Sequence, residues 1–158
     1  MNPTTSGDRS EICLFDLETT IPRRRGQGFS ILEFGAILVC PKRLVELKSF
    51  ASLVRPDYLS SISLDSVRCN GITRDAVAEA RSFSISPKKF TVSSTVRRVW
   101  AGHNIVRFDC VRIREAFEKI GRPAPEPKGI IDSLASLDDV RMNLEVLKYC
   151  ATVLFLVW

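Results

Sequence analysis

Histidine is nearly absent from this 158-residue sequence, which contains only His103. The five cysteines show no CxxC spacing, which argues against a zinc site or a disulfide framework. Long apolar runs are also lacking: the ending ATVLFLVW is far shorter than the roughly 20 residues that cross a bilayer. Residues 1–11 are polar without an apolar h-region, so we expect a disordered N-terminus, no secretory signal and no membrane partner.

Most of the cysteines lie in apolar segments with the pattern of strands or helices, namely Cys13, Cys40, Cys110 and Cys150. Such cysteines are typical of reduced side chains that fill a core. Reduced thiols belong to reducing compartments, so we expect an intracellular protein of the nucleus, the cytoplasm or both.

The charge balance is basic: 23 Lys and Arg against 18 Asp and Glu give a net charge of +5 and a pI near 9.1. A basic chain favours a polyanionic partner such as nucleic acid, although many basic proteins bind none. The length and the 45% of hydrophobic residues suit one domain with one core.

The apolar pattern predicts strands first and then alternating strands and helices. Strands are expected at 12–16, 31–39, 44–54, 99–102 and 130–131, and helices at 105–120 and 138–154. This order predicts an α/β domain built on a mixed sheet. Residues 82–98 are rich in serine, threonine and lysine and show no clean period.

Two acids stand two positions apart at the end of the first predicted strand. Because a strand places residues i and i+2 on one face, the carboxylates of Asp16 and Glu18 project the same way. Adjacent carboxylates repel each other unless a cation lies between them, and Mg²⁺ or Mn²⁺ prefers oxygen ligands of this kind. Taken alone, a D-x-E pair is common, and solvated acids are the plainer interpretation.

Two further acids lie on the apolar stripes of predicted helices. Asp109 shares its stripe with Ile113 and Phe117, and an unpaired carboxylate buried there is costly, so it must be paired, protonated or bound to metal. A salt bridge to a nearby arginine is the alternative. Asp139 shares a face with Val146, but it also lies in the first turn after Ser136, where helix capping is the interpretation that the local sequence favours.

In order along the chain, FDLETT (15–20), AGHNIVRFDCVRIREAF (101–117) and SLDDVRMNLEVLKYCA (136–151) resemble the three motifs of the DnaQ-like, or DEDD, exonucleases. ILEFGAILVCPK, NGIT and APEP-GIIDSL fit the plant NEN exonuclease-domain proteins within that group. The resemblance covers residues 12–155. It implies a ribonuclease-H-like fold, with a mixed sheet flanked by helices, and 3′→5′ removal of nucleotides from DNA or RNA with a free 3′ end.

The resemblance also implies the site. The metal-binding, catalytic acids would be Asp16, Glu18, Asp109 and Asp139, holding two Mg²⁺ or Mn²⁺ ions about 3.5–4 Å apart. Residues near the nucleic acid would be Thr19, Thr20, His103 and Asn104. Arg23, Arg24 and Arg25 are added because they lie in the loop after the metal acids, where phosphate contacts are expected. For His103 and Asn104 the alternative is that they shape the entry to the helix, and for the arginines it is a merely solvated loop.

The sequence departs from the family in two places. DnaQ-like sites place a histidine five residues before the last acid, or a tyrosine four before it, where this chain has Leu134 and Ala135. Between residues 133 and 136 the family has a further helical segment, so part of the C-terminal half is missing, as after a skipped exon. Residues 84–98 are atypical as well, because they replace a family helix with a stretch that reads like a shifted frame.

These departures weaken the expected activity. Loss of a general base costs about 10²–10⁴ in rate. It does not abolish activity, because water bound to the metal is already acidified. We therefore expect an impaired exonuclease, or a product that folds poorly. The alternative function is a catalytically inactive module that binds nucleic acid or a protein partner.

Overall fold

The computed structural model describes residues 11–84 and 98–134. Four predictions lie outside these ranges: the expected disordered N-terminus except Glu11, all but the ends of the atypical segment 84–98, the predicted helix 138–154, and Asp139. Glu11 is ordered, since it forms an ion pair with Arg98 at 2.8 Å. No helix within the described ranges is both long enough and apolar enough to cross a membrane.

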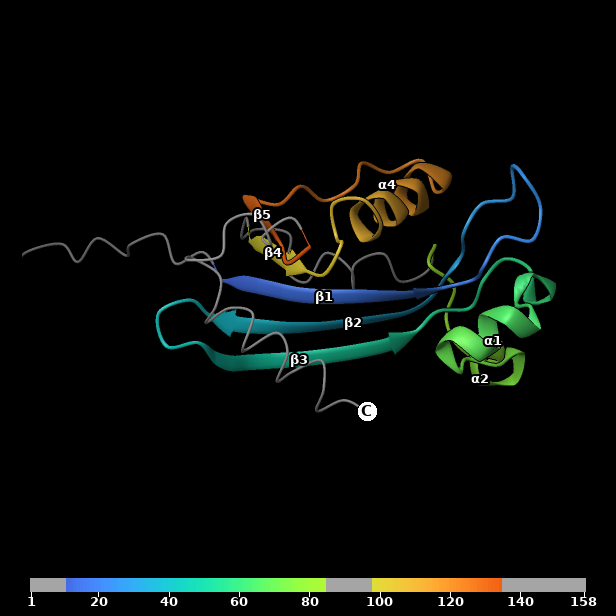
Figure 1. The fold of residues 1–158 in the computed structure, drawn as a ribbon, viewed down its shortest axis with the longest axis horizontal. Helices are drawn as coiled ribbons and strands as arrows, with labels where there is room; N and C mark the ends of the chain where they lie inside the picture. Colours follow the sequence, from blue (N-terminus) through green and yellow to red (C-terminus); the bar gives the residue numbers. More distant parts are fainter. Residues whose placement is uncertain (1–10, 85–97, 135–158) are drawn as a thin grey trace, which may run out of the picture.

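The described chain forms one mixed five-stranded sheet (Figure 1). The strands are β1 (Ile12–Thr19), β2 (Ile31–Cys40), β3 (Val45–Leu53), β4 (Val99–Gly102) and β5 (Gly129–Asp132), in the spatial order β3-β2-β1-β4-β5. Strands β1, β2 and β3 pair antiparallel, whereas β4 is parallel to β1 and β5 is parallel to β4. The predicted α/β mixed sheet is confirmed.

Strand β1 is three residues longer than the sequence pattern predicts, because it continues from Asp16 to Thr19. Leu17, Glu18 and Thr19 extend the strand because β2 supplies antiparallel partners along this length, including Glu33 opposite Glu18. Side chains alternate along β1, so Phe15 and Leu17 are buried while Asp16 is exposed.

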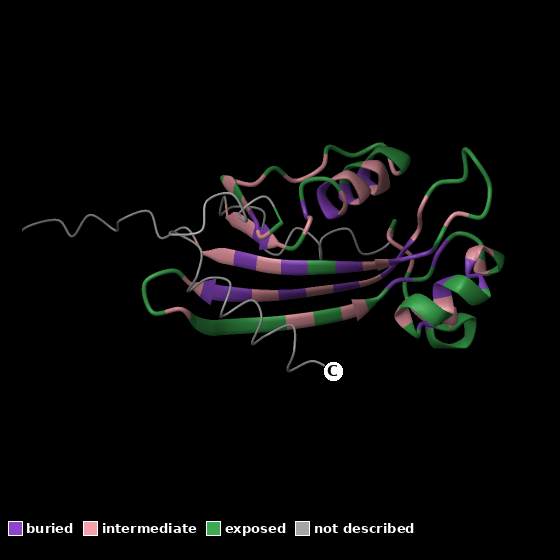
Figure 2. Cartoon of the chain, viewed as in Figure 1, coloured by how far each residue is buried: buried purple, intermediate pink, exposed green. Residues whose placement is uncertain are grey.

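Helix α4 (Asp109–Lys119) covers one face of the sheet and closes the main core. Its buried side chains Ile113 and Phe117 pack in one cluster with Phe15 and Phe34 of the sheet. Figure 2 shows this contact as buried residues facing each other across the helix and the sheet. The predicted helix 105–120 begins later than expected, since residues 105–108 form turns.

A second, smaller cluster lies beyond the end of β3, where three short helical segments follow one another: η1 (Leu59–Ser61), α1 (Leu64–Asn70) and α2 (Arg74–Ala78). It contains Leu32, Ile62, Ile72 and Val77. The side chains of Ser63 and Thr73 cap α1 and α2, and Gly71 ends α1 in the left-handed region at φ 73°.

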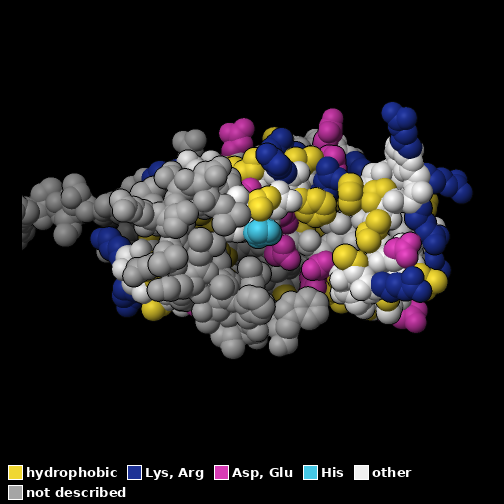
Figure 3. Space-filling view, viewed as in Figure 1, with side chains coloured by type: hydrophobic (Ala, Val, Ile, Leu, Met, Phe, Trp, Pro, Cys, Tyr) yellow, Lys and Arg dark blue, Asp and Glu magenta, His cyan; other side chains and the backbone are white. Residues whose placement is uncertain are grey.

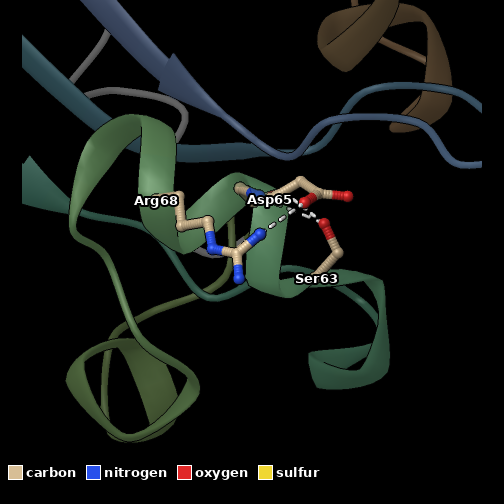
Figure 4. A network of polar contacts seen from close by, with 4 residues as sticks. Ser63, Asp65 and Arg68 are labelled. Atoms are coloured by element: carbon tan, nitrogen blue, oxygen red, sulfur yellow. Dashed lines mark hydrogen bonds and ion pairs between the residues drawn. The ribbon is translucent and has the colours of Figure 1, made fainter.

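The surface of α1 carries an ion pair between Arg68 and Asp65 at 3.6 Å, close to the Ser63 cap (Figure 4). Both side chains of the pair are well exposed. An exposed pair of this kind adds little to stability, so the cap rather than the ion pair fixes the start of α1.

Candidate active site

The strand acids lie on the face of β1 opposite the main core. Asp16 is exposed and Glu18 is half-buried, while Leu17 between them is buried in the core. The predicted shared face of Asp16 and Glu18 therefore holds. Figure 3 shows the single histidine of the chain among acidic side chains on one side of the molecule.

Asp109 joins these acids from α4. Its side chain is 2% exposed, and its Oδ1 accepts a hydrogen bond of 3.0 Å from the backbone N–H of Leu17. Strand β4 pairs with β1 only as far as Leu14, so the carboxylate takes the place of a strand partner beyond that point. No ion pair to Asp109 exists among residues 11–84 and 98–134, so its buried charge is met by the backbone and not by an arginine.

The acids shift one another's ionisation. Burial and then the Asp16 charge raise the pKa of Asp109 to about 7. Burial raises the pKa of Glu18 to about 7, with further contributions from Asp16 and from Glu33 across the strand pair. The pKa of Asp16 is raised too, because the surrounding protein partly desolvates its carboxylate even though the residue is exposed; the Leu17 N–H and His103 oppose this shift. Neighbouring carboxylates that repel one another in this way are suited to binding a cation, which neutralises their charge.

His103 and Asn104 occupy the turn between β4 and α4. The exposed His103 ring places Nδ1 2.9 Å from the Ser133 hydroxyl, which fixes its orientation. Asn104 has a left-handed backbone (φ 55°), and its buried Oδ1 has no hydrogen-bond partner within the described residues. The structure thus supports a role in shaping the helix entry for Asn104 and leaves the outer face of His103 open to solvent.

Asp132 is a functional neighbour that the sequence analysis did not single out. It is 8% exposed, and its two carboxylate oxygens accept hydrogen bonds from the N–H groups of Val106 and Leu134, each 3.0 Å long. Its charge contributes to the raised pKa of Asp109. The available signal was its position at the end of a predicted strand, where acids commonly bind nearby N–H groups.

Thr19 and Thr20 lie inside the protein. Thr20 is fully buried, and its hydroxyl accepts a hydrogen bond of 2.9 Å from the Ser30 N–H. The Thr19 carbonyl accepts one of 3.0 Å from the Asn70 side chain. Both residues close the base of the loop after β1. Because the Thr20 side chain is fully buried, it cannot contact nucleic acid as predicted.

The described acids do not complete a metal site by themselves. In the two described ranges no group of three or more His, Cys, Asp or Glu side chains is placed to hold an ion. The fourth predicted acid, Asp139, lies outside those ranges. Leu134, five residues before it, is 39% exposed and has no group that can accept a proton.

The fold matches known exonucleases. The nuclease domain of 3′hExo, described as a DEDDh family member bound to rAMP, superposes with a TM-score of 0.64 at 19% identity, covering 77% of this chain and 65% of that one. The ExoI/SSB-Ct complex gives a TM-score of 0.66 at 22% identity over 85% of this chain and 30% of that one. These likenesses define the class: a ribonuclease-H-like exonuclease fold.

The family itself is shown by sequence. The Exonuclease (RNase T) family model matches residues 13–155, and the chain belongs to this family. Protein NEN2 of Arabidopsis thaliana is 53% identical over 97% of this chain, and Protein NEN1 is 55% identical over 94%. The chain spans 37% and 38% of the length of these two relatives.

The same alignments reveal positions that this chain lacks. The alignment with NEN2 runs over 188 residues but takes in 97% of a 158-residue chain, or about 153 residues, so about 35 positions have no counterpart here. For NEN3 the figures are 188 residues and 99%, which leaves about 32. The relatives therefore carry about 30–35 residues in the aligned region that have no counterpart in this chain.

Proposed function

We propose that this chain carries the active site of a metal-dependent 3′→5′ exonuclease that hydrolyses phosphodiester bonds of DNA or RNA, and that the site is impaired. The observation that supports it is the hydrogen bond between Asp109 and Leu17, which joins helix α4 to the strand that holds Asp16 and Glu18. Acids from segments 92 residues apart thereby share one electrostatic region.

The donor chemistry fits Mg²⁺ or Mn²⁺, since carboxylate oxygens are the ligands that these hard cations prefer. Asp16, Glu18 and Asp109 would hold the ions, with Asp139 as the fourth acid. When bound, two such ions activate a water molecule and neutralise the charge of the phosphodiester.

The protein's own contribution is to position groups. Asp109 is held in one orientation by the Leu17 N–H, while the exposed Asp16 remains accessible to a substrate. His103 is oriented by the Ser133 hydroxyl, and its electrostatic interaction with Asp16 lowers the pKa of that acid. We propose that His103 lies near the terminal nucleotide of a strand with a free 3′ end.

The impairment follows from the residues five and four positions before the fourth acid, Asp139. Leu134 and Ala135 stand where the family has a histidine or a tyrosine, and neither accepts a proton. Removing a general base lowers the rate by about 10²–10⁴ without abolishing catalysis.

The test is digestion of a 3′-labelled oligonucleotide with Mg²⁺ or Mn²⁺, with EDTA as the blank. We expect slow release of mononucleotides that Asp16→Ala abolishes. Asp57→Ala, which removes an exposed acid from the loop after β3, is the matched control and should retain the wild-type rate. Equal rates in the Asp16→Ala and wild-type proteins would show that the release comes from a contaminant.

A second candidate is a catalytically inactive module that binds nucleic acid or a partner. The missing proton acceptor and the roughly 35 missing positions favour it. Binding of single strands with no mononucleotide release, in either metal, would establish this candidate over the first.

We also propose an intracellular location, in the nucleus, the cytoplasm or both. Cys13 and Cys110 are free, buried thiols, and burial raises the pKa of each to about 11, as for inert core side chains. Imaging of a fluorescent fusion in plant cells tests this location.

A further inference from the structure

We propose that the arginine loop (residues 20–30) binds the phosphates of a single nucleic-acid strand on the 5′ side of the terminal nucleotide. The inference rests on the proposed function for the position of the 3′ end. It goes further by assigning the surface that holds the rest of the strand and by specifying a sequence-independent, electrostatic mode of binding.

Within the described residues, the positive charge of this loop is not neutralised by acidic side chains. Arg23, Arg24 and Arg25 are consecutive and exposed, and none of them forms an ion pair with a described residue. Lys119 of α4 adds a fourth cation, since its Nζ lies 3.7 Å from where a Cβ on Gly28 would be. Figure 3 shows Lys and Arg side chains at the end of the molecule where Figure 1 places this loop and α1.

The loop has a fixed shape at its base and at its tip. Thr20 N–H donates to the Ser30 carbonyl and Ser30 N–H donates to the Thr20 hydroxyl, both at 2.9 Å. The Arg23 N–H donates to the Gln27 side chain at 2.8 Å, and Gly26 turns the chain in the left-handed region at φ 84°. The arginines are therefore presented on a defined turn.

The return arm of the loop is anchored on α4. The Phe29 ring meets the Phe108 ring edge-on at 5.6 Å, and the Arg112 guanidinium lies 4.2 Å from the Phe29 ring centre. The Arg112 side chain is 14% exposed and pairs with Glu115 at 3.1 Å, so it serves as a clamp within the protein. Phe108 immediately precedes Asp109, which couples the loop to the acids.

The geometry places the arginines within reach of a strand bound at the acids. Glu18 and Arg23 are five residues apart, so at most about 18 Å of extended chain separates them. The acids themselves repel phosphates, and a strand that approaches them needs compensating positive charge close by. The arginine loop supplies this charge at the end of β1.

The test is binding of a fluorescent 20-nucleotide single strand in EDTA, so that no hydrolysis is needed. For the triple variant Arg23→Ala, Arg24→Ala, Arg25→Ala we expect at least tenfold weaker binding at low salt, and a slope of log K against log[salt] smaller by about 2, or roughly 0.7 per lost phosphate contact. The matched control Lys42→Ala, Arg43→Ala, Lys48→Ala removes three exposed charges in the β2–β3 turn and β3, at the opposite end of the sheet, and should bind like wild type.

A second variant tests the anchoring. Phe29→Ala keeps every arginine and should reproduce part of the loss, because the loop then no longer rests on α4. Thermal unfolding of each variant shows that the fold is retained. Wild-type affinity and salt slope in the arginine variant, or equal losses in the two charge variants, would overturn the proposal, whereas absence of hydrolysis in metal would affect only the proposed function.

Discussion

Gly102 ends β4 where the chain turns towards His103, and it passes very close to β1. A Cβ at this position would lie 2.8 Å from the Phe15 carbonyl oxygen and 3.1 Å from the Ile105 side chain. A backbone carbonyl within the sheet cannot move aside as the end of a flexible side chain can. The turn that carries His103 and Asn104 therefore needs a residue without a Cβ.

Replacing Gly102 with alanine should lower the free energy of unfolding by about 1–3 kcal/mol, the cost typical of overpacking. Urea denaturation of both proteins measures the difference. Gly129→Ala is the control, because nothing lies within 4 Å of a Cβ there. A loss of the same size in both variants would assign the effect to strand glycines in general and not to this close approach.

Asp109 makes stability depend on pH in the absence of metal. Its folded-state pKa of about 7 lies above the ordinary value of 3.8, so the folded protein binds more protons than the unfolded chain between these values. The stabilising contribution is complete below about pH 4 and is lost as the pH rises through about 7. Glu18 acts in the same direction.

We expect the urea midpoint in EDTA to fall between pH 5 and pH 8 for the wild type, by an amount worth about 1–3 kcal/mol for Asp109. Asp109→Asn keeps an oxygen that accepts from the Leu17 N–H and should flatten this dependence. If the Asn variant retains the full fall, groups other than Asp109 are responsible.

At the scale of elements, α1 supports the loop after β1 although it is only seven residues long. The hydroxyl of Ser63 accepts from the Ser66 N–H at 3.1 Å, and the Ser66 hydroxyl accepts from the Ile21 N–H at 2.8 Å. The Asn70 side chain binds the Thr19 carbonyl from the other end of the helix. The helix therefore fixes the start of the arginine loop from two points.

Ser66→Ala should cost about 1–3 kcal/mol of stability, because the variant leaves the Ile21 N–H without its acceptor and removes the hydrogen bond between the Ser63 and Ser66 hydroxyls. Hydrogen exchange at the Ile21 amide should become faster than in the wild type. Leu64→Ala in the same helix, at a side chain that is 70% exposed, provides the control and should change neither quantity. An unchanged Ile21 exchange rate in Ser66→Ala would contradict the supporting role of α1.

The elements differ in how far the sequence determines them. Each of the five strands carries an apolar run or an alternation, and all five were predicted, with β1 too short because its end is held by pairing with β2. Helices α1 and α2 were missed because seven and five residues are too few to show a period. Their caps at Ser63 and Thr73 and the terminal Gly71 were the usable signals.

At the scale of the whole molecule, the site is formed by contacts between residues far apart in the sequence, and local patterns do not predict such contacts. The shared face of Asp16 and Glu18 follows from strand alternation, and the apolar stripe singles out Asp109. That Asp109 joins the two strand acids was implied only by the family resemblance, and its hydrogen bond to Leu17, 92 residues away, was not predicted. The buried position of Thr20 depends on Ser30, across the loop, and was not foreseen. Asp132 was overlooked because its partners, Val106 and Leu134, come from two different turns.

The missing positions lead to a prediction about the transcript. Alignments with NEN2 and NEN3 leave about 35 and 32 positions without a residue in this chain. We expect full-length transcript reads across codons 133–136 to reveal a longer form that encodes a segment of about this length, including a histidine. Reads that consistently support the present join would refute this prediction and leave the short form as the native product.

The bond between Asp109 and Leu17 has a consequence for any shortened form of this protein. Both partners lie upstream of residue 133, and so do β1, the arginine loop and the clamp that ties the loop to α4. Loss of downstream sequence would remove the fourth acid, Asp139, and the position of the proton acceptor before it, while leaving the loop that we propose binds the strand. Expressed beside an intact copy, such a form would then compete for the same ends, acting as a decoy.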